Sequence, residues 1–328
     1  MMIFKLCLFS GLLLFYNAIL FPCTDTAEIK APKKLTFKKL YTLKGHVDVV
    51  QFLKILKDEV LISGSADTTM RAWSMEGTCI KKLYNSRGWI NKIIELSDGR
   101  IACGANGGGI NIWNMEKNSY ITLPNLKKEN YYGNSVIQLA NGNLAFSTWK
   151  GDINVWDIEK DTCVKTTALK EHAAWISSLI ELKDSNYLAT SSWDSNIRIW
   201  DASNDKISSI RTLFGHTDCV NAVVQIDEKR LASASDDKTI KIWQIDCNEN
   251  KATLSGHDDG VYALIIVDGK IISGSRDKTV KIWDSESKNC LLTIPCEDKI
   301  HSLEFSAKNQ YLFVGQSGGN IEVFQIFL

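Results

Sequence analysis

A histidine, a hydroxyl residue and an aspartate recur in the same order in this 328-residue sequence, and they are the residue types of a nucleophilic hydrolase. In that chemistry the histidine takes the proton of the hydroxyl and the aspartate orients the histidine. Each trio here also includes a tryptophan, with the hydroxyl ten residues and the aspartate six residues before it. Four identical catalytic sites in one chain are implausible, so we interpret the sets as structural and expect no enzymatic activity. The four sets are His46, Ser63, Asp67, Trp73; His172, Thr190, Asp194, Trp200; His216, Ser233, Asp237, Trp243; and His257, Ser273, Asp277, Trp283.

The fifth histidine, His301, lies outside these sets and has Cys296 and Asp298 just before it. This single cluster lacks the second pair of ligands that a zinc site needs. The sequence contains no paired Cys-x-x-Cys spacing, no phosphate-binding loop and no helical His-x-x-x-His motif. We therefore expect no metal and no cofactor, and we interpret His301 as part of a loop and the start of a strand.

An aromatic residue closes a short β-rich run every 40 to 44 residues, which is the period of a repeat architecture. No linker rich in proline, glycine or serine separates the copies, so they predict one domain over residues 35–328 rather than two or three. The seven anchors are Trp73, Trp113, Trp156, Trp200, Trp243, Trp283 and Phe324.

One repeat shows the elements that position these residues. Residues 261–267, 271–275, 279–283 and 290–294 are β-rich runs, and Asp268-Gly269 is a turn dipeptide between the first two. Polar and apolar residues alternate in the third run, as in a half-buried strand. Four short antiparallel strands at this period are typical of one propeller blade. The sequence thus predicts an all-β fold, a seven-bladed β-propeller of four-stranded antiparallel blades.

Gly-His, Ser-Gly-Ser, Asp and Ile-Trp-Asp follow one another in this repeat, and in these motifs the chain resembles the WD40 repeat family. The resemblance implies that each set of four residues forms a hydrogen-bonded chain, because such polar groups are costly to bury alone and tolerable in a closed network. It also implies that residues 35–43 form a strand that completes the last blade, whose own repeat ends at its third strand.

Three blades depart from the pattern, and we predict that they are softer than the others. Replacing several polar partners by apolar groups together is nearly neutral, but it removes the network. In blades two, three and seven the hydroxyl is replaced by Cys103, Phe146 and Val314, and the aspartate by Gly107, Lys150 and Gly318.

The N-terminus differs from the repeats, because residues 3–21 are apolar apart from Lys5, Ser10 and Asn17. We interpret residues 1–22 as a signal peptide or signal anchor and residues 23–34 as a linker. A cleaved signal favours a secreted or extracytoplasmic propeller. The alternatives are a membrane anchor with a cytoplasmic propeller, favoured by the lysines at positions 30, 33, 34, 38 and 39, and lipidation at Cys23. Cys79, Cys163 and Cys290 occupy similar places in three blades and are expected to be small buried residues.

Lys plus Arg equals Asp plus Glu, at 38 residues each, so the chain has no formal net charge. A nucleic-acid-binding surface is normally basic, and we therefore expect no nucleic-acid partner.

A binding surface is expected on the top face of the ring, where partners of the family often dock. The resemblance implies that three slots per repeat point there: third and fifth after the histidine position, and directly before the aspartate position. Exposed tryptophan and tyrosine side chains are common at the centre of interfaces. Packing into the ring is the alternative for Trp89 and Trp175. Trp149 and Trp193 are harder to explain in that way. The predicted partner-binding residues are Trp89, Tyr132, Trp149, Trp175, Trp193, Tyr262 and Arg276.

The function predicted from the sequence is a non-enzymatic scaffold that binds a protein or peptide on this top face. One alternative is an extracytoplasmic propeller that binds or hydrolyses a small molecule at the central channel. A third hypothesis is a substrate receptor for protein modification, but we find no accessory domain in this sequence that supports it.

Overall fold

The computed structural model describes residues 35–84, 88–105, 109–115, 117, 119–122, 133–160, 162–166, 171–183, 185–203, 206–247 and 250–327. The chain separates into two compact units, Met1–Lys34 and Leu35–Leu328, and the account below concerns the second. The predicted signal or anchor segment, the linker, Gly107 and Tyr132 lie outside the described residues. Secretion, membrane anchoring and lipidation therefore stay predictions. Across the residues that are described, no helix is long and apolar enough to cross a membrane.

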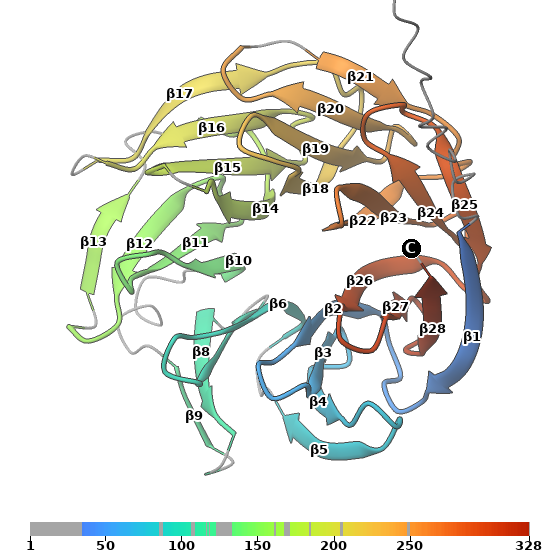
Figure 1. Ribbon diagram of the computed structural model, residues 1–328. Helices are drawn as coiled ribbons and strands as arrows, with labels where there is room; N and C mark the ends of the chain where they lie inside the picture. Colours follow the sequence, from blue (N-terminus) through green and yellow to red (C-terminus); the bar gives the residue numbers. More distant parts are fainter. Residues whose placement is uncertain are drawn as a thin grey trace, which may run out of the picture. The chain divides into compact units, whose positions relative to one another are not determined.

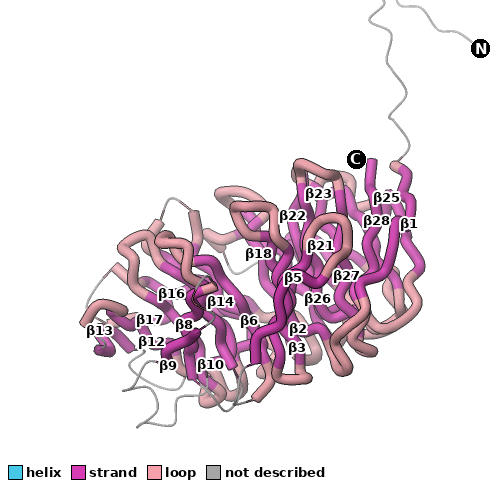
Figure 2. Tube along the Cα trace, turned by 90° about the horizontal axis from the view of Figure 1, so that it is seen from below, coloured by secondary structure: helices cyan, strands magenta, loops and turns pink. Residues whose placement is uncertain are grey.

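The described chain forms seven four-stranded antiparallel sheets arranged in a ring, which confirms the predicted propeller (Figure 1). Figure 2 shows the connecting loops at the ends of the strands on the two faces of the ring. Blade 1 contains β2 (Val50–Ile55), β3 (Leu61–Ser65), β4 (Thr69–Trp73) and β5 (Cys79–Tyr84); blade 2 contains β6 (Ile90–Glu95), β7 (Ile101–Ala105), β8 (Gly109–Asn114) and β9 (Ser119–Thr122); blade 3 contains β10 (Gly133–Gln138), β11 (Leu144–Thr148), β12 (Ile153–Asp157) and β13 (Thr162–Thr166); blade 4 contains β14 (Ile176–Glu181), β15 (Tyr187–Ser192), β16 (Ile197–Asp201) and β17 (Ser208–Leu213).

The remaining blades follow the same order from the innermost strand outward. Blade 5 contains β18 (Val220–Gln225), β19 (Arg230–Ser235), β20 (Ile240–Gln244) and β21 (Asn250–Leu254); blade 6 contains β22 (Val261–Val267), β23 (Lys270–Ser275), β24 (Thr279–Asp284) and β25 (Cys290–Pro295); blade 7 contains β26 (Ile300–Ser306), β27 (Tyr311–Gln316), β28 (Ile321–Phe327) and, from the start of the chain, β1 (Thr36–Leu43).

The hydrophobic core is divided among the junctions between neighbouring blades. Seven apolar clusters occur in the described residues, and each combines side chains of two adjacent blades. Every aromatic anchor lies in the cluster shared with the preceding blade, as Trp73 does with Phe313 and Val323 of blade 7. A single sheet has two apolar faces and cannot bury them alone, so the blades depend on one another for burial.

The ring is closed by β1, as predicted. It pairs antiparallel with β28 along its whole length, from Thr36 opposite Phe327 to Leu43 opposite Ile321. Figure 1 shows β1, in blue, along the outer edge of blade 7. The last blade thus takes its outermost strand from the start of the chain, which covers an edge of β28 that would otherwise be unpaired.

Blade 7 has a polar network of its own, which the sequence did not suggest. Glu322 on β28 is only 1% exposed and forms an ion pair with Lys39 of β1. Its second carboxylate oxygen accepts a hydrogen bond from Gln316 Nε2 at 2.6 Å. Lys39 also pairs with Glu297 at 2.6 Å. A buried carboxylate with these partners ties the closing strand to the blade that it completes.

The four predicted hydrogen-bonded sets are all present. In each, the tryptophan Nε1 donates to the hydroxyl, the hydroxyl bonds to histidine Nε2, and histidine Nδ1 bonds to the aspartate, with every distance between 2.7 and 2.8 Å. Blade 2 lacks this arrangement: Cys103 is buried where the hydroxyl would be, so a sulfur atom takes the place of the hydroxyl oxygen beside the buried indole of Trp113. Burial raises the pKa of the Cys103 thiol to about 12, so it stays uncharged.

One expectation about the cysteines is wrong. Cys79, Cys163 and Cys290 are exposed rather than buried. They lie on β5, β13 and β25, the outermost strands of their blades, where one face of the strand meets solvent.

We predict that Lys39→Met destabilises the ring by about 2 kcal/mol, because it leaves the buried Glu322 carboxylate without its cation. Urea unfolding followed by circular dichroism measures the change. Lys38→Met is the matched control, since Lys38 is the exposed neighbour on the same strand. Equal stability of the two variants would contradict the role of the ion pair. Lys39→Met combined with Glu322→Met should recover part of the loss.

We also predict faster amide exchange in the second strands of blades 2 and 3, β7 and β11, than in β15, β19 and β23. The latter three belong to blades with a complete polar set, and exchange reports the local free energy of opening. Blade 7 is left out of this prediction because of its Lys39–Glu322 network. Hydrogen exchange with mass spectrometry measures the difference, and equal protection in all five strands would contradict it.

Candidate functional site

In blades 1, 4, 5 and 6 the polar set joins two loops that lie at the same end of the strands. In each set the aspartate also accepts a hydrogen bond from the backbone N–H of the residue after the histidine, at 3.0 to 3.1 Å. The loop before the innermost strand is thereby joined to the turn after the second strand. We call the face of the ring that carries these loops the top face.

The same sets contain the hydrogen bonds of a Ser-His-Asp triad, yet they lack access for a substrate. The aspartate can only accept, so Nδ1 of the histidine carries the proton and Nε2 accepts from the hydroxyl. The hydroxyl residues Ser63, Thr190, Ser233 and Ser273 are 0% exposed. Each hydroxyl oxygen already accepts the tryptophan N–H. These four constellations are therefore structural, as the repetition in the sequence predicts.

Two of the three sequence slots are neighbours in space. In blades 1, 4, 5, 6 and 7 the residue before the aspartate position donates its backbone N–H to the carbonyl of the third residue after the histidine position, at 2.9 Å in each case. Trp193 is paired in this way with Trp175, Asp236 with Cys219, and Arg276 with Gly260. The backbone therefore places the side chains of both slots together on the top face.

A cavity of about 500 Å³ opens at the centre of the top face and is lined by residues of all seven blades. Its walls include the complete set of residues fifth after the histidine position. Trp89, Trp175 and Trp193 add an aromatic side, and blades 5 and 6 add charged side chains. The lining residues are Gln51, Trp89, Asn91, Asn134, Trp175, Ser177, Trp193, Cys219, Asn221, Asp236, Tyr262, Arg276 and His301.

The tryptophans of this cavity are partly exposed to solvent. Trp175 and Trp193 are stacked, with ring centroids 5.0 Å apart and an interplanar angle of 15°. Trp193 is 47% exposed and Trp89 is 49% exposed. Trp149 is also exposed, on the turn between β11 and β12, but it does not line the cavity. The structure thus brings five of the predicted residues together, places Trp149 apart from them, and does not describe Tyr132.

The charged side of the cavity is organised around Tyr262. The guanidinium of Arg276 lies over its ring, 4.2 Å from the centroid, and the His301 ring is 5.0 Å away. Burial raises the pKa of the Tyr262 phenol, and the nearby Asp236 carboxylate raises it further. Burial, followed by the charge of Arg276, lowers the pKa of His301 to about 4. Tyr262 and His301 are thus uncharged at neutral pH, while Arg276 and Asp236 carry the charges.

Several residues of the inner ring bond to the neighbouring blade. Asn134 Nδ2 donates to the carbonyl of Ile176 at 2.7 Å, and Asn221 Nδ2 donates to that of Val261 at 3.1 Å. Asn91 donates to the side chain of Asn134 at 2.9 Å. These amides hold adjacent innermost strands at the wall of the cavity, so their role includes positioning the blades.

Asp218, Cys219 and Asp236 bring potential metal ligands within 4.8 Å of one another. The Cys219 thiol donates to the carbonyl of Trp193, and Asp236 accepts from Asn221. Burial, followed by the charges of Asp236 and Asp218, raises the pKa of the Cys219 thiol. A protonated thiol that donates a hydrogen bond is a poor metal ligand, so the expectation of no metal stays in place.

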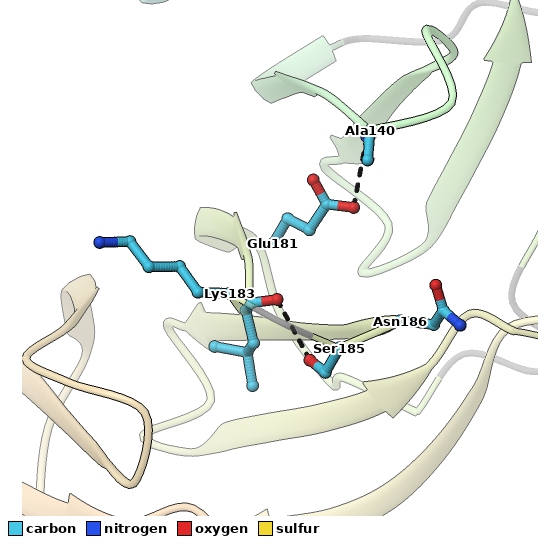
Figure 3. Close-up of a pocket in the computed structure, with 6 residues that line it drawn as sticks. Ala140, Glu181, Lys183, Ser185 and Asn186 are labelled. Carbon is cyan, nitrogen blue, oxygen red and sulfur yellow. Dashed lines mark hydrogen bonds between the residues drawn. The ribbon is translucent and has the colours of Figure 1, made fainter.

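A second hollow of about 420 Å³ lies at the other ends of the strands and is different in character (Figure 3). Its lining includes Ala140, Glu181 and Lys183, and none of the described lining residues is aromatic. There Glu181 accepts the backbone N–H of Ala140 at 3.4 Å, a contact between neighbouring blades. Glu95, Gln138 and Gln225 accept a turn N–H of the preceding blade in the same way. The polar groups of this second hollow thus stabilise the junctions between blades. For this reason we place the candidate site at the top face instead.

His301 and Asp236 line the cavity, although neither is among the partner-binding residues predicted from the sequence. His301 is the second residue of β26, in agreement with its predicted place at the start of a strand, and its ring is part of the cavity wall. Its place fifth after the histidine position was a sufficient signal, because that slot lines the cavity in every blade.

Comparisons with known proteins agree with this architecture. The family described as "WD domain, G-beta repeat" matches residues 37–74, 161–201 and 207–244, and the family described as "TEP-1 C-terminal beta-propeller" matches residues 257–325. The nuclear distribution protein nudF of Aspergillus niger is 30% identical over 105 residues, which are 30% of this chain and 24% of that protein. The WD repeat and SOCS box-containing protein 1 of Danio rerio is 29% identical over 102 residues, again 30% of this chain and 24% of the relative.

The matched part therefore spans about a quarter of the length of these relatives. Among solved structures, the WD40 β-propeller domain of Doa1 superimposes with a TM-score of 0.75. That similarity has 24% sequence identity and covers 88% of this chain and 96% of the other. At this identity it shows the fold alone.

The polar sets make the ring sensitive to acid. Burial lowers the pKa of His46 and His257 below the ordinary 6.5, although their aspartates oppose the shift. Burial would raise the pKa of Asp237, but hydrogen bonds from His216 and Thr239 hold it well below the ordinary 3.8. Hydrogen bonds likewise outweigh burial and lower the pKa of the other three aspartates. For all these groups the unfolded chain binds protons more readily than the folded one, so stability falls as pH falls.

We predict that stability declines first below about pH 6.5, as the two histidines protonate in the unfolded chain, and further below about pH 3.8 through the aspartates. Asp237→Asn should cost about 2 kcal/mol at pH 7 and should flatten the second decline. Urea unfolding across pH measures both effects. Asp246→Asn, an exposed position in the same blade, is the control, and equal behaviour of the two variants would contradict the prediction.

Proposed function

The chain belongs to the WD40 repeat family, and from that premise we propose that it binds a protein or peptide partner at the top-face cavity. WD40 propellers generally act as non-enzymatic scaffolds for protein interactions. The catalytic residue types of this chain are used inside the blades, where the hydroxyls are buried. A binding function requires only a rigid surface, which the ring supplies.

The observation that carries the proposal is the group of exposed tryptophans around one cavity. Trp89 and Trp193 expose nearly half of their surface while lining the same hollow as Trp175. Large aromatic side chains held together at a surface are typical of the centre of protein interfaces. The stacked Trp175–Trp193 pair is supported by a backbone hydrogen bond, so little order has to be acquired on binding.

The second predicted function is the binding or hydrolysis of a small molecule at the central channel. The size of the top-face cavity makes it a second candidate function. Its volume of about 500 Å³ falls in the range of small-molecule sites. Thermal shift with a metabolite panel, with and without divalent metal ions, separates the two functions. Stabilisation by one small compound, or its metal-dependent turnover, would favour this second candidate.

We predict that Trp193→Ala leaves the fold intact and weakens partner binding by tenfold or more, about 1.4 kcal/mol, because it removes half of the stacked pair. The full chain is used to capture partners from an extract of its own cells, and the captured proteins are then purified and titrated. Circular dichroism verifies the fold of each variant.

Two other aromatic positions serve as comparisons. Phe214→Ala is the matched control, because Phe214 is 67% exposed but does not line the cavity. Trp149→Ala tests whether the binding surface extends to blade 3. Unchanged titrations with Trp193→Ala would contradict the site, and a loss with Phe214→Ala would place binding elsewhere.

A further inference from the structure

We propose that the top-face cavity selects a peptide segment carrying one basic and one acidic side chain on the same side of an extended backbone. The inference rests on the proposed function and adds the chemistry of the partner. It follows from three consecutive positions on the rim, Trp193 of blade 4, Asp236 of blade 5 and Arg276 of blade 6. They occupy the same slot in their blades and present an aromatic ring, an anion and a cation in turn.

The first half of the site fits a cation. The stacked pair of Trp175 and Trp193 offers aromatic surface, and the carboxylate of Asp236 lines the same cavity, with the exposed Asp218 carboxylate within 4.8 Å of it. Cys219 connects the two, since its thiol donates to the Trp193 carbonyl at 3.5 Å and lies within 4.8 Å of an Asp236 oxygen. Aromatic surface beside a carboxylate attracts a lysine or arginine side chain through cation–π and ionic contacts.

The carboxylate of Asp236 is held in place for such a contact. Its Oδ1 accepts from Asn221 Nδ2 at 3.0 Å, and the Tyr262 hydroxyl is a further hydrogen-bond partner of this carboxylate. Gly260 makes room for it, because a Cβ at that position would lie 2.5 Å from Oδ1. Any other residue at 260 would displace the carboxylate from the cavity wall.

The second half fits an anion. The guanidinium carbon of Arg276 lies 4.2 Å from the centroid of the Tyr262 ring and, in the part of the chain that is described, the side chain has no ion pair and no side-chain hydrogen bond. Its N–H groups are therefore available to a carboxylate, which a guanidinium can bind in a bidentate contact. The neighbouring His301 is uncharged at neutral pH, since its pKa is lowered to about 4, and it does not compete as a cation.

The two charges do not neutralise each other. Both line one cavity, yet no ion pair joins Asp236 and Arg276, and Tyr262 is a neighbour of both. A ligand with a single charge would satisfy one and leave the other beside it without a partner, which costs affinity. In an extended peptide, residues two apart point to the same side with a separation of about 7 Å. A peptide with a basic and an acidic residue at that spacing presents both charges on one side, toward Asp236 and Arg276 on the cavity wall.

The test uses the full chain and fluorescein-labelled heptapeptide pools with degenerate flanks and defined central residues. The pools contain Arg-Ala-Glu, Glu-Ala-Arg, Arg-Ala-Ala, Ala-Ala-Glu or Ala-Ala-Ala, and fluorescence polarisation measures their binding. One of the two dipolar pools should bind about tenfold more tightly than either singly charged pool. Asp236→Asn and Arg276→Gln should each reduce it to the level of the singly charged pools, whereas Asp246→Asn should leave it unchanged.

Equal binding of dipolar and singly charged pools, or indifference to both substitutions, would overturn the inference. If the pools bind through Trp193 without regard to charge, the proposed function stands and the inference fails. The inference also fails if no pool binds while a purified protein partner still requires Trp193. If neither the pools nor a purified partner depends on Trp193, both proposals fail.

Discussion

The burial of one aromatic anchor per blade against the preceding blade is the interaction on which the rest of the structure depends. Each anchor joins two sheets in a shared apolar cluster, so no blade has a core that is only its own. Seven such contacts must all form at once, and the seventh requires the two ends of the ring to meet. The chain meets this constraint by placing β1 on blade 7, where Leu43 enters the cluster of Trp73.

The same anchors connect the core to the surface. A buried indole has an N–H that must be satisfied, and in blades 1, 4, 5 and 6 the partner is a hydroxyl. The hydroxyl requires the histidine, and the histidine requires the aspartate, which then holds two top-face loops together. The residue directly before each aspartate is thereby fixed in position. Packing at the blade junctions thus determines where Trp193, Asp236 and Arg276 stand.

Much of this could be predicted from the sequence, because the residues of each polar set keep constant distances from their tryptophan. Ser273, Asp277 and Trp283 keep this spacing because they lie in one hairpin, formed by β23 and β24. A shift of its register would turn the apolar side chains of the hairpin toward solvent. The stacking of Trp175 on Trp193 depends on the relative position of two loops, and the slots predicted only that both lie on the top face. The ion pair of Lys39 with Glu322 joins residues from opposite ends of the chain, so local patterns do not reveal it. The exposure of Cys79 was mispredicted because its period matched the repeat, while its strand proved to be the outer edge.

The contrast between blades 3 and 4 shows why rigid blades suit a binding site. Trp149 and Trp193 occupy the same slot, but blade 3 has Lys150 where blade 4 has Asp194. The Trp193 loop is held by three hydrogen bonds. Asp194 accepts from the His172 ring and from the backbone N–H of Ala173, and the Trp193 N–H donates to the carbonyl of Trp175. In blade 3, Lys150 cannot accept the first two of these bonds. A side chain contributes to affinity when its position is fixed before binding, because less entropy is then lost. Blades 4, 5 and 6 combine complete polar sets with the aromatic and charged residues of the cavity, and for this reason recognition is expected to centre on them.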